Sequence, residues 1–355
     1  MAMTNENVKD HRQQCDTPMV SVVMIAYNNA RHLPDAIRGV ARQRTSFPVE
    51  LVLCDDASTD DTPALVARFQ KEYPGLIRYH RNARNLGVQR NYLEAFRHVR
   101  GKYLAMCDAD DFWTSRDKLA TQVAYMETNP DCAVCFHRVM NWFVANGEKS
   151  LSNGTADQRR ADTTVADLAR RNPITNMSVL YRRELVDLSS LPLWLSEIRL
   201  LDYAMHMLYA SHGKVHFINR TMGVYRQSPQ AIWSMTEAYA RMEMSLMVRI
   251  RLIHHFENGG GMQEGEDNDD IRKRVVANLR EASMAILASM LRTVVDDAER
   301  REHTFALLRE IGGDYTTTEL ERRAAVTPKG KSAAKRLLSF GRRMASRLLP
   351  VPHIG

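Results

Sequence analysis

The chain has 355 residues, of which 44% are hydrophobic and 26% are charged, which is ordinary for a soluble globular protein. No run approaches the roughly 20 apolar residues that span a bilayer, and the polar first residues lack the apolar segment of a secretory signal. We therefore expect a cytoplasmic protein with one large domain and appendages. The net charge of +7 equals the seven lysine and arginine residues that follow Pro328, where no acidic residue occurs. The rest of the chain is neutral overall, which argues against the basic folded face of a nucleic-acid-binding domain.

An odd number of cysteines, five, in a chain without a signal sequence argues against a disulfide framework. The segment "CAVC", Cys132 to Cys135, has the spacing of a zinc or redox motif. No second pair follows it, so we interpret it as part of a buried strand.

The first part of the chain alternates between short apolar runs and helical patterns. Strands are predicted within Met19–Asn29, Val49–Thr62, Leu76–Asn82 and Lys102–Trp113. Helices are predicted between them, within Ala30–Gln43, Pro63–Tyr73 and Asn85–Gly101, with Gly101 closing the third. This alternation predicts an α/β fold, a Rossmann-like and mostly parallel sheet flanked by helices.

The pattern continues beyond Trp113 and then becomes helical. A helix is predicted at Asp117–Pro130, a strand at Cys132–Phe143, a polar loop at about 145–161, strands at Asn176–Leu185 and Lys214–Arg226, and a helix at Glu197–Gly213. Helical patterns at Met235–His255 and Ile271–Ile311 form a C-terminal appendage. The predicted organisation is a disordered N-terminus (1–18), an α/β domain (19–235), a helical appendage (236–327) with a flexible, glycine- and acid-rich linker (257–270), and a basic tail (328–355).

Three of the predicted strands end in polar side chains. These are Tyr27 and Asn28, then Asp55 and Asp56, then Asp108, Asp110 and Asp111. In open parallel sheets, ligands bind in the crevice beyond the carboxyl ends of the strands, so we expect these side chains to converge there.

The segment "CDADD" places two carboxylates one residue apart at a strand end, where their repulsion is costly unless a cation relieves it. Magnesium is commonly held by one or two carboxylates together with substrate phosphates. The motif therefore favours metal-assisted chemistry on a nucleotide-diphosphate substrate. The alternative is a helix cap beside solvated loop acids, which an isolated Asp-x-Asp triplet does not exclude.

Several segments together resemble the family 2 glycosyltransferases, which have the GT-A fold. They are "VSVVMIAYNN", "LVLCDDASTDDT", "RNLGVQRN", "GKYLAMCDADDFW" with "DKLATQV", and "LLDYAMHM" with "GKVHFINRTMGVYR". They follow the family's order from about Val20 to Trp233, about three-fifths of the chain, and leave the region from Glu257 onward uncovered. The resemblance implies a GT-A domain at 19–235 and an inverting, nucleotide-sugar-dependent enzyme.

The resemblance also implies roles for the donor-binding residues. The end of the first strand, Ala26, Tyr27 and Asn28, matches the family's base-binding position. Asp56 matches the acid that recognises uracil, while Asp55 supports the turn. Arg90 matches a basic residue near the nucleotide or its phosphates.

The acids of "CDADD" match the family's metal motif. Asp108 then faces the ribose or the sugar, Asp110 binds Mn²⁺ or Mg²⁺, and Asp111 is a supporting contact. Arg226, in "VYRQS", is a candidate for the diphosphate. Two departures from the family pattern are Ala57, where glycine is commonest, and Ser228, where many relatives have a histidine that contacts metal or phosphate.

Asp202, in "RLLDYAMHM", matches the family's catalytic base. A lone acid in an otherwise apolar run needs a partner or costs stability, which also marks it. The alternative for Asp202 is a helix N-cap, and the nearby Glu197 is a competing base. Among the aromatic residues, Tyr225 and Trp233 are candidates for shaping the sugar or acceptor site, and Trp113 is better explained by core packing.

The tail "SAAKRLLSFGRRMASRLLP" has a stripe of apolar residues and separate basic residues. This pattern favours a basic amphipathic helix on an anionic membrane, against a helix docked on the body or a disordered tail.

The predicted function is sugar transfer from a UDP- or dTDP-linked donor to a glycan or lipid-linked acceptor in surface polysaccharide synthesis, with no role for nucleic acid. The alternatives are a sugar-nucleotide nucleotidyltransferase, disfavoured because "AYNNARHL" has no glycine-rich phosphate loop, and a non-catalytic sugar-nucleotide-binding protein. A dinucleotide-binding oxidoreductase lacks its Gly-x-Gly-x-x-Gly turn here.

Overall fold

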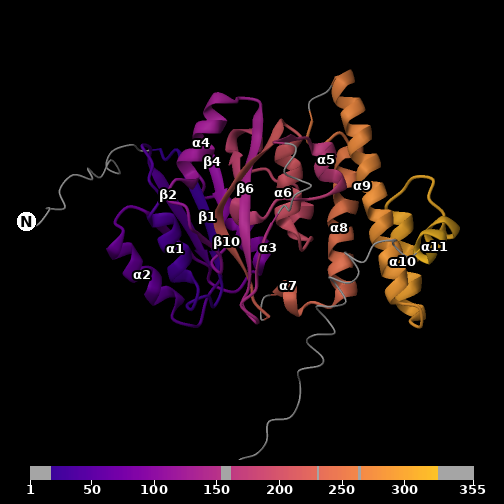
Figure 1. Ribbon diagram of the computed structural model, residues 1–355, viewed down its shortest axis with the longest axis horizontal. Helices are drawn as coiled ribbons and strands as arrows, with labels where there is room; N and C mark the ends of the chain where they lie inside the picture. The colour runs from indigo at the N-terminus through magenta and orange to yellow at the C-terminus, as the bar shows by residue number, and fades with distance from the viewer. Residues whose placement is uncertain (1–16, 153–160, 230–231, 263–264, 327–355) are drawn as a thin grey trace, which may run out of the picture. The chain divides into compact units, whose positions relative to one another are not determined.

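The computed structural model describes residues 17–152, 161–229, 232–262 and 265–326 (Figure 1). The predicted tail at 328–355, and the predicted disordered N-terminus apart from Thr17 and Pro18, lie outside the described residues. The chain forms two compact units, Met1–Ile286 and Leu287–Gly355, which we describe separately.

The first unit is built on one sheet whose strands run in the order β3-β2-β1-β4-β9-β6-β10-β5. The strand bounds are β1 Val20–Ala26, β2 Val49–Asp55, β3 Ile77–Arg81, β4 Tyr103–Met106, β5 Phe112–Trp113, β6 Cys132–Phe143, β9 Leu180–Arg182 and β10 Lys214–Gln227. Neighbouring strands in β3-β2-β1-β4, and the pair β6–β10, are parallel, whereas β9 is antiparallel to β4 and β6, and β5 to β10. The predicted mostly parallel α/β sheet is thus confirmed, and β7 (Lys149–Leu151) and β8 (Asp162–Thr163) pair at its margins.

Helices cover both faces of this sheet. Figure 1 shows α1 (Leu33–Ala41) and α2 (Thr62–Glu72) on one side of the strands, and α3 (Val88–Phe96) and α6 (Leu201–Ala210) on the other. Apolar side chains of α1, α2 and α4 (Lys118–Thr128) share one core with alternate residues of β1. Six of the seven β1 residues are buried because both faces are covered, which explains the continuous apolar run in the sequence.

Of two predicted details of the sheet region, one is confirmed and one is wrong. Cys132 and Cys135 are free and buried in β6, as the interpretation of "CAVC" as a strand predicted. Gly101 does not close α3, which ends at Phe96. A Cβ on Gly101 would lie 2.5 Å from the backbone nitrogen of Ser21, so glycine is needed there because β1 and the start of β4 approach closely.

The helices after the sheet differ in their bounds from those that the sequence indicated. In the first unit, α5 (Val165–Arg170), α7 (Ile232–Met235) and α8 (Ala238–Glu257) complete the cover, and α9 spans Glu266–Thr293. The unit extends past the predicted boundary at residue 235 because α8 packs against α6, with the Arg249 guanidinium 4.8 Å from the centre of the Tyr203 ring.

The predicted linker at 257–270 is too long. Helix α8 continues to Glu257, and α9 already begins at Glu266, with Glu266, Asp267 and Asp269 in its first turn. Acidic side chains stabilise a helix N-terminus through the helix dipole, so the residues that suggested a flexible linker instead favour the start of α9.

The second unit contains the end of α9 with α10 (Ala298–Glu310) and α11 (Thr317–Ala325). Side chains cap the last two helices: Asp297 accepts a hydrogen bond from the Arg300 amide, and Thr316 accepts one from the Glu319 amide. The chain breaks between α9 and α10, where the sequence had suggested one helical pattern from Ile271 to Ile311.

Candidate active site

Sheet topology brings the predicted strand ends to one edge. Strands β2, β1 and β4 are adjacent and parallel, so their carboxyl ends lie together. The Asp56 amide donates to the Ala26 carbonyl at 2.8 Å, and the Cys107 amide donates to the Val23 carbonyl at 3.0 Å. The residues that follow the three strands therefore lie at one edge of the sheet, where the sequence predicted a ligand-binding crevice.

The end of β1 is followed by the exposed ring of Tyr27 and by the hydrogen-bonded side-chain amide of Asn28. Ala26 is buried, whereas Tyr27 keeps 48% of its surface exposed. Asn28 has a positive φ of 52°, and its side-chain oxygen accepts hydrogen bonds from the amides of Thr59 and Asp60. Asn28 thus ties the loop after β1 to the loop after β2, and its role on the base stays a prediction.

The turn after β2 is organised by Asp55, as expected. Its carboxylate accepts hydrogen bonds from the Ser58 amide at 2.9 Å and from the Tyr79 hydroxyl at 2.6 Å. Ala57, inside this turn, has a φ of 60°, in the left-handed region that favours glycine. The family's preference for glycine at this position therefore has a backbone cause.

Ala57→Gly is expected to stabilise the protein. A non-glycine residue in the left-handed region costs about 1–2 kcal/mol, and glycine gives back about 0.4–1 kcal/mol through the unfolded chain. We expect a net gain of about 0.5–1 kcal/mol, measured by urea unfolding. The matched control is Ala67→Gly in the exposed middle of α2, which should lose a similar amount; equal effects at both sites would contradict this account.

Asp56 fastens the loop that precedes α3. Its buried carboxylate accepts hydrogen bonds from the Asn82 side chain, the Leu86 amide and the Gly87 amide, each at 2.8 Å. Two of these reach Oδ1 and one reaches Oδ2, which leaves one acceptor position on Oδ2 for a ligand. Arg90, in the first turn of α3, is exposed at the same edge.

The acid loop, defined here as Asp108–Asp111, follows β4. Asp108 accepts a hydrogen bond from the Tyr92 hydroxyl, and its two oxygens lie 3.3 and 3.0 Å from Nδ2 of Asn176. Tyr92 belongs to α3, and Asn176 begins the short 3-10 helix η2, Asn176–Ser178. The sequence analysis missed both residues, because nothing in their local patterns distinguishes them from ordinary helix and loop positions.

The other end of the acid loop is bound to Arg226 of β10. The Arg226 amide donates to Oδ1 of Asp111 at 2.8 Å, and its Nη1 donates to the Asp110 carbonyl at 2.9 Å. The guanidinium also forms an ion pair with Asp35 of α1 and lies 4.4 Å from the centre of the Phe112 ring. Asp111 thus binds Arg226, which is buried against the loop; the expected contacts of both residues with the donor stay predictions.

Asp202 lies in the first turn of α6 but does not cap it. The helix begins at Leu201 with Leu200 as its N-cap, so the alternative that Asp202 is the N-cap is wrong. Burial, and then the charge of Asp108, raises the pKa of Asp202 to about 6. The competing base Glu197 is exposed and pairs with Arg251 at 2.7 Å, and the choice between the two acids as the base stays a prediction.

Four carboxylates act on one another and on one ring at this edge of the sheet. Burial raises the pKa of Tyr225, and the charges of Asp111, Asp110, Asp108 and Asp202 raise it further. Burial, followed by the charges of Asp110 and Asp108, also raises the pKa of Asp111. Such mutual repulsion is what a bound cation relieves.

The acids fit a metal ion that takes most of its ligands from a substrate. Among the described residues, no cluster of three or more His, Cys, Asp or Glu side chains is arranged to hold a metal. The carboxylate of Asp108 accepts hydrogen bonds from Tyr92 and Asn176, and that of Asp111 accepts one from Arg226. The Asp110 carboxylate is partly exposed. One carboxylate with diphosphate oxygens and water is an ordinary ligand set for Mg²⁺.

The remaining aromatic candidates differ in burial. Trp113 is buried, donates from Nε1 to the Met177 carbonyl at 2.8 Å and has the Lys118 amine 4.0 Å from its ring centre, which confirms core packing. Tyr225 is half-buried in the crevice. The side chain of Trp233 lies outside the described residues.

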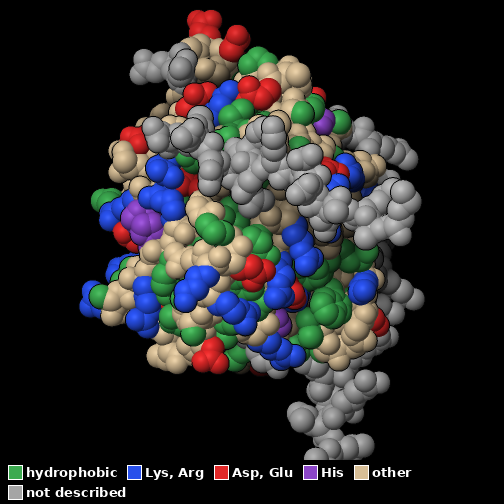
Figure 2. Space-filling model, turned by 90° about the vertical axis from the view of Figure 1, so that its left-hand side faces the viewer, with side chains coloured by type: hydrophobic (Ala, Val, Ile, Leu, Met, Phe, Trp, Pro, Cys, Tyr) green, Lys and Arg blue, Asp and Glu red, His purple; other side chains and the backbone are tan. Residues whose placement is uncertain are grey.

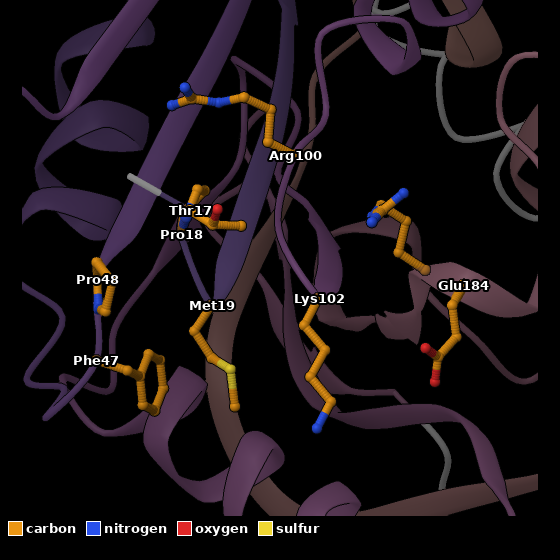
Figure 3. A pocket seen from close by; sticks show the side chains of 9 residues that line it. Thr17, Pro18, Met19, Phe47, Pro48, Arg100, Lys102 and Glu184 are labelled. Carbon is orange, nitrogen blue, oxygen red and sulfur yellow. The ribbon is translucent and has the colours of Figure 1, made fainter. Parts of the chain in front are cut away.

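A cavity of about 380 Å³ lies at the opposite edge of the sheet. Residues that precede β1, β2 and β4 line it, among them Met19, Phe47 and Arg100 (Figure 3). Its Arg100 pairs with Glu50, its Lys102 pairs with Glu127, and the two basic side chains extend in different directions. This cavity is separate from the crevice that holds the acids.

One face of the molecule carries mixed charge. Figure 2 shows lysine and arginine side chains in several groups, with hydrophobic and acidic side chains between them. This distribution agrees with the neutral net charge of the chain before Pro328.

Comparisons with known proteins agree with this geometry. Residues 21–185 match the model of glycosyl transferase family 2. An uncharacterized protein of Mycobacterium tuberculosis is 37% identical over 214 residues, which is 60% of this chain and 60% of that protein. An Escherichia coli protein named UDP-Glc:alpha-D-GlcNAc-diphosphoundecaprenol beta-1,3-glucosyltransferase WfaP is 27% identical over 118 residues, 31% of this chain and 42% of that protein.

A solved structure extends the likeness to the fold. The structure of S. aureus TarS 1–349 in complex with UDP-GlcNAc matches with a TM-score of 0.59 and 15% identity, over 82% of this chain and 80% of that one. The alignments with the curated relatives span at most 60% of those proteins' own length. The match to glycosyl transferase family 2 therefore covers residues 21–185, somewhat less than half of the chain, and the likeness to TarS shows the GT-A fold.

Proposed function

We propose that this protein is an inverting glycosyltransferase that moves a sugar from a UDP- or dTDP-linked donor to an acceptor hydroxyl. The observation that carries the proposal is the position of Asp202 relative to the acid loop: a partly buried acid on α6 lies near Asp108, at the edge where Tyr27 and Asp56 follow their strands. A base and a diphosphate-binding site in one crevice are what a single displacement at the anomeric carbon requires.

In the proposed reaction, the Asp202 carboxylate accepts the proton of the acceptor hydroxyl while that oxygen bonds to the anomeric carbon. The bond between this carbon and the donor diphosphate breaks, and the diphosphate leaves with the electron pair on the opposite face, which inverts the configuration. Asp110 would hold Mn²⁺ or Mg²⁺, which when bound neutralises charge on the diphosphate. Arg226 and Asp111 keep the acid loop in place, and Tyr27, Asn28, Asp56 and Arg90 are proposed to hold the nucleotide.

The rate is expected to fall on the acid side with an apparent pKa near 6. The base must be ionised, and burial together with the charge of Asp108 raises the pKa of Asp202 to about 6. Below that pH, each unit should lower kcat/KM about tenfold, because the ionised fraction of the free enzyme falls tenfold. A pH–rate profile measures this; an acid limb that stays near pH 4 would mean that Asp202 is not the base.

Donor identity is the first experiment. A panel of sugar nucleotides is screened for Mn²⁺-dependent thermal shifts, and each binder is then assayed for donor hydrolysis or transfer. The proposal requires a metal-dependent shift with a UDP- or dTDP-sugar, followed by turnover. Binding without turnover would favour a non-catalytic binding protein, and pyrophosphate release from a nucleoside triphosphate with a sugar phosphate would favour a nucleotidyltransferase.

The acceptor is proposed to be a glycan or a lipid-linked intermediate of surface polysaccharide synthesis. The WfaP match supports this, since the name of that relative specifies a diphosphoundecaprenol-linked acceptor. Within the described residues, no helix is long and apolar enough to cross a bilayer. We propose a cytoplasmic protein that binds the inner face of the membrane peripherally through its basic tail.

Removing the tail is expected to abolish binding to anionic vesicles. The seven basic residues after Pro328 supply the attraction to anionic headgroups, and the apolar stripe between them supplies insertion. The measurement is co-sedimentation with phosphatidylglycerol vesicles of the full chain and of a chain that ends at Thr327. Neutral phosphatidylcholine vesicles are the control, and unchanged binding after truncation would exclude the tail as the anchor.

A further inference from the structure

Two side chains from outside the acid loop hold its first carboxylate. Tyr92 of α3 donates its hydroxyl proton to Oδ1 of Asp108, and Nδ2 of Asn176 lies 3.0 Å from Oδ2 and 3.3 Å from Oδ1. The same Nδ2 lies 3.1 Å from the Tyr92 hydroxyl oxygen, which closes a triangle of three groups. We call Tyr92 and Asn176 the Asp108 clamp.

The chemistry of the three groups determines their orientation. An ionised carboxylate only accepts hydrogen bonds, so the Tyr92 proton and the amide nitrogen of Asn176 must both point at Asp108. The amide oxygen of Asn176 then faces away, and it is buried without a partner among the described residues. Neither rotation of the tyrosine hydroxyl nor a flip of the amide preserves these bonds.

The clamp leaves Asp108 with few free positions for accepting hydrogen bonds. Oδ1 receives both the Tyr92 hydroxyl and the longer Asn176 contact, whereas Oδ2 receives Asn176 alone. One acceptor position therefore stays open on Oδ2 of a partly exposed carboxylate. A single acceptor position matches one hydroxyl group of a ligand.

Elements outside the loop fix the position of the clamp. Helix α3, which carries Tyr92, begins at the loop that Asp56 fastens through the Leu86 and Gly87 amides. Helix η2, which carries Asn176, is held at Met177 by the indole of Trp113. The direction of Asp108 is thus determined by two supported elements and not by the loop itself.

We infer that Tyr92 and Asn176 are positioning residues that aim the open oxygen of Asp108 at a ribose hydroxyl of the donor. The inference rests on the proposed function. Ribose joins the base to the diphosphate, and Asp108 follows β4, the neighbour of β1, whose end is proposed for the base, and stands two residues before Asp110, proposed for the diphosphate. Without the clamp, Asp108 turns freely and no longer selects that hydroxyl.

The test compares hydroxyl recognition in wild type and clamp variants. Calorimetry with Mn²⁺ measures the affinity of UDP, 2′-deoxy-UDP and 3′-deoxy-UDP for wild type, Tyr92→Phe, Asn176→Ala and the isosteric Asn176→Asp. Wild type is expected to bind at least one deoxy analogue about tenfold more weakly than UDP, since hydrogen bonds to charged groups are the stronger class. The variants should bind UDP about tenfold more weakly and should lose the discrimination between UDP and that analogue.

The matched control is Tyr103→Phe, at the other end of β4. It also removes a tyrosine–carboxylate hydrogen bond, from the Tyr103 hydroxyl to Glu127 at 2.6 Å, and it should keep both affinity and discrimination. Equal weakening of UDP and both analogues in the clamp variants, or no discrimination in wild type, would overturn the inference while leaving the proposed function intact. If wild type binds neither UDP nor dTDP, the proposed donor class fails, and this inference fails with it.

Discussion

Asp202→Asn is expected to lower kcat by about 10²–10⁴-fold, which is the usual contribution of a positioned general base. The amide keeps the volume of the carboxyl but cannot accept the proton of the acceptor hydroxyl. Asp202 lies in the first turn of α6, outside the set of residues proposed to hold the nucleotide, so the affinity for the donor should change little. The measurements are kcat in a transfer assay and donor affinity by calorimetry.

The matched control for this variant is Glu197→Gln. Glu197 is an acid five residues earlier, is exposed, and pairs with Arg251, so neutralising it should leave kcat within a few-fold of wild type. If Asp202→Asn abolished donor binding while its turnover per bound donor stayed normal, Asp202 would be a donor ligand and not the base. If Glu197→Gln were the inactive variant, the assignment of the two acids would be reversed.

Asp110→Asn is expected to lower metal-dependent turnover by roughly 10²–10³-fold, because a divalent ion stabilises the leaving diphosphate by several kcal/mol. Excess Mn²⁺ should recover part of the loss, since the diphosphate oxygens still supply ligands. The variant should also raise the melting temperature of the metal-free protein. In the wild type, the Asp110 charge contributes to the raised pKa of Asp108 and of Asp111, so removing it relieves repulsion among buried acids.

Opposite changes in stability and in activity distinguish a metal ligand from a structural acid. The measurements are thermal unfolding without metal and a Mn²⁺ titration of the transfer rate. Asp61→Asn, which neutralises an exposed acid at the start of α2, serves as the control and should change neither. A metal-free protein that is less stable after Asp110→Asn, with an unchanged Mn²⁺ requirement, would remove Asp110 from the metal site.

Local pattern was enough to predict the fold class and the edge of the sheet that carries the site. Runs such as "VSVVMIA" are continuous because strands covered on both faces bury every side chain, and this signal does not depend on distant residues. The polar residues that follow such runs lie at one edge because the strands are parallel, so that their carboxyl ends lie together. The predicted candidates Tyr27, Asp56 and Asp108 are therefore found at one edge.

Predictions from local pattern were wrong where the same residue types are found in two kinds of structure. The acids at 266–269 suggested a flexible linker, but in the structure they begin α9, because negative charge is favourable at a helix N-terminus as well as in solvent. Gly101 resembled a helix C-cap, but it is needed where β1 and the start of β4 come within contact. Each error concerns a residue type that suits two environments: acids suit a solvated linker or a helix N-terminus, and glycine suits a helix C-cap or a close backbone contact.

The amino-acid sequence by itself determined the α/β sheet, the order of its elements and the acids that follow β2 and β4, since these follow from hydrophobic periodicity and from a family motif read residue by residue. Only the tertiary structure decided which side chains hold those acids. Tyr92 and Asn176 lie 16 and 68 positions from Asp108, and Asp35 lies 191 positions from Arg226 on β10; no local pattern marks them. Their roles arise because packing brings α1, α3, η2 and β10 to one loop, where buried carboxylates need hydrogen-bond donors and counter-charges.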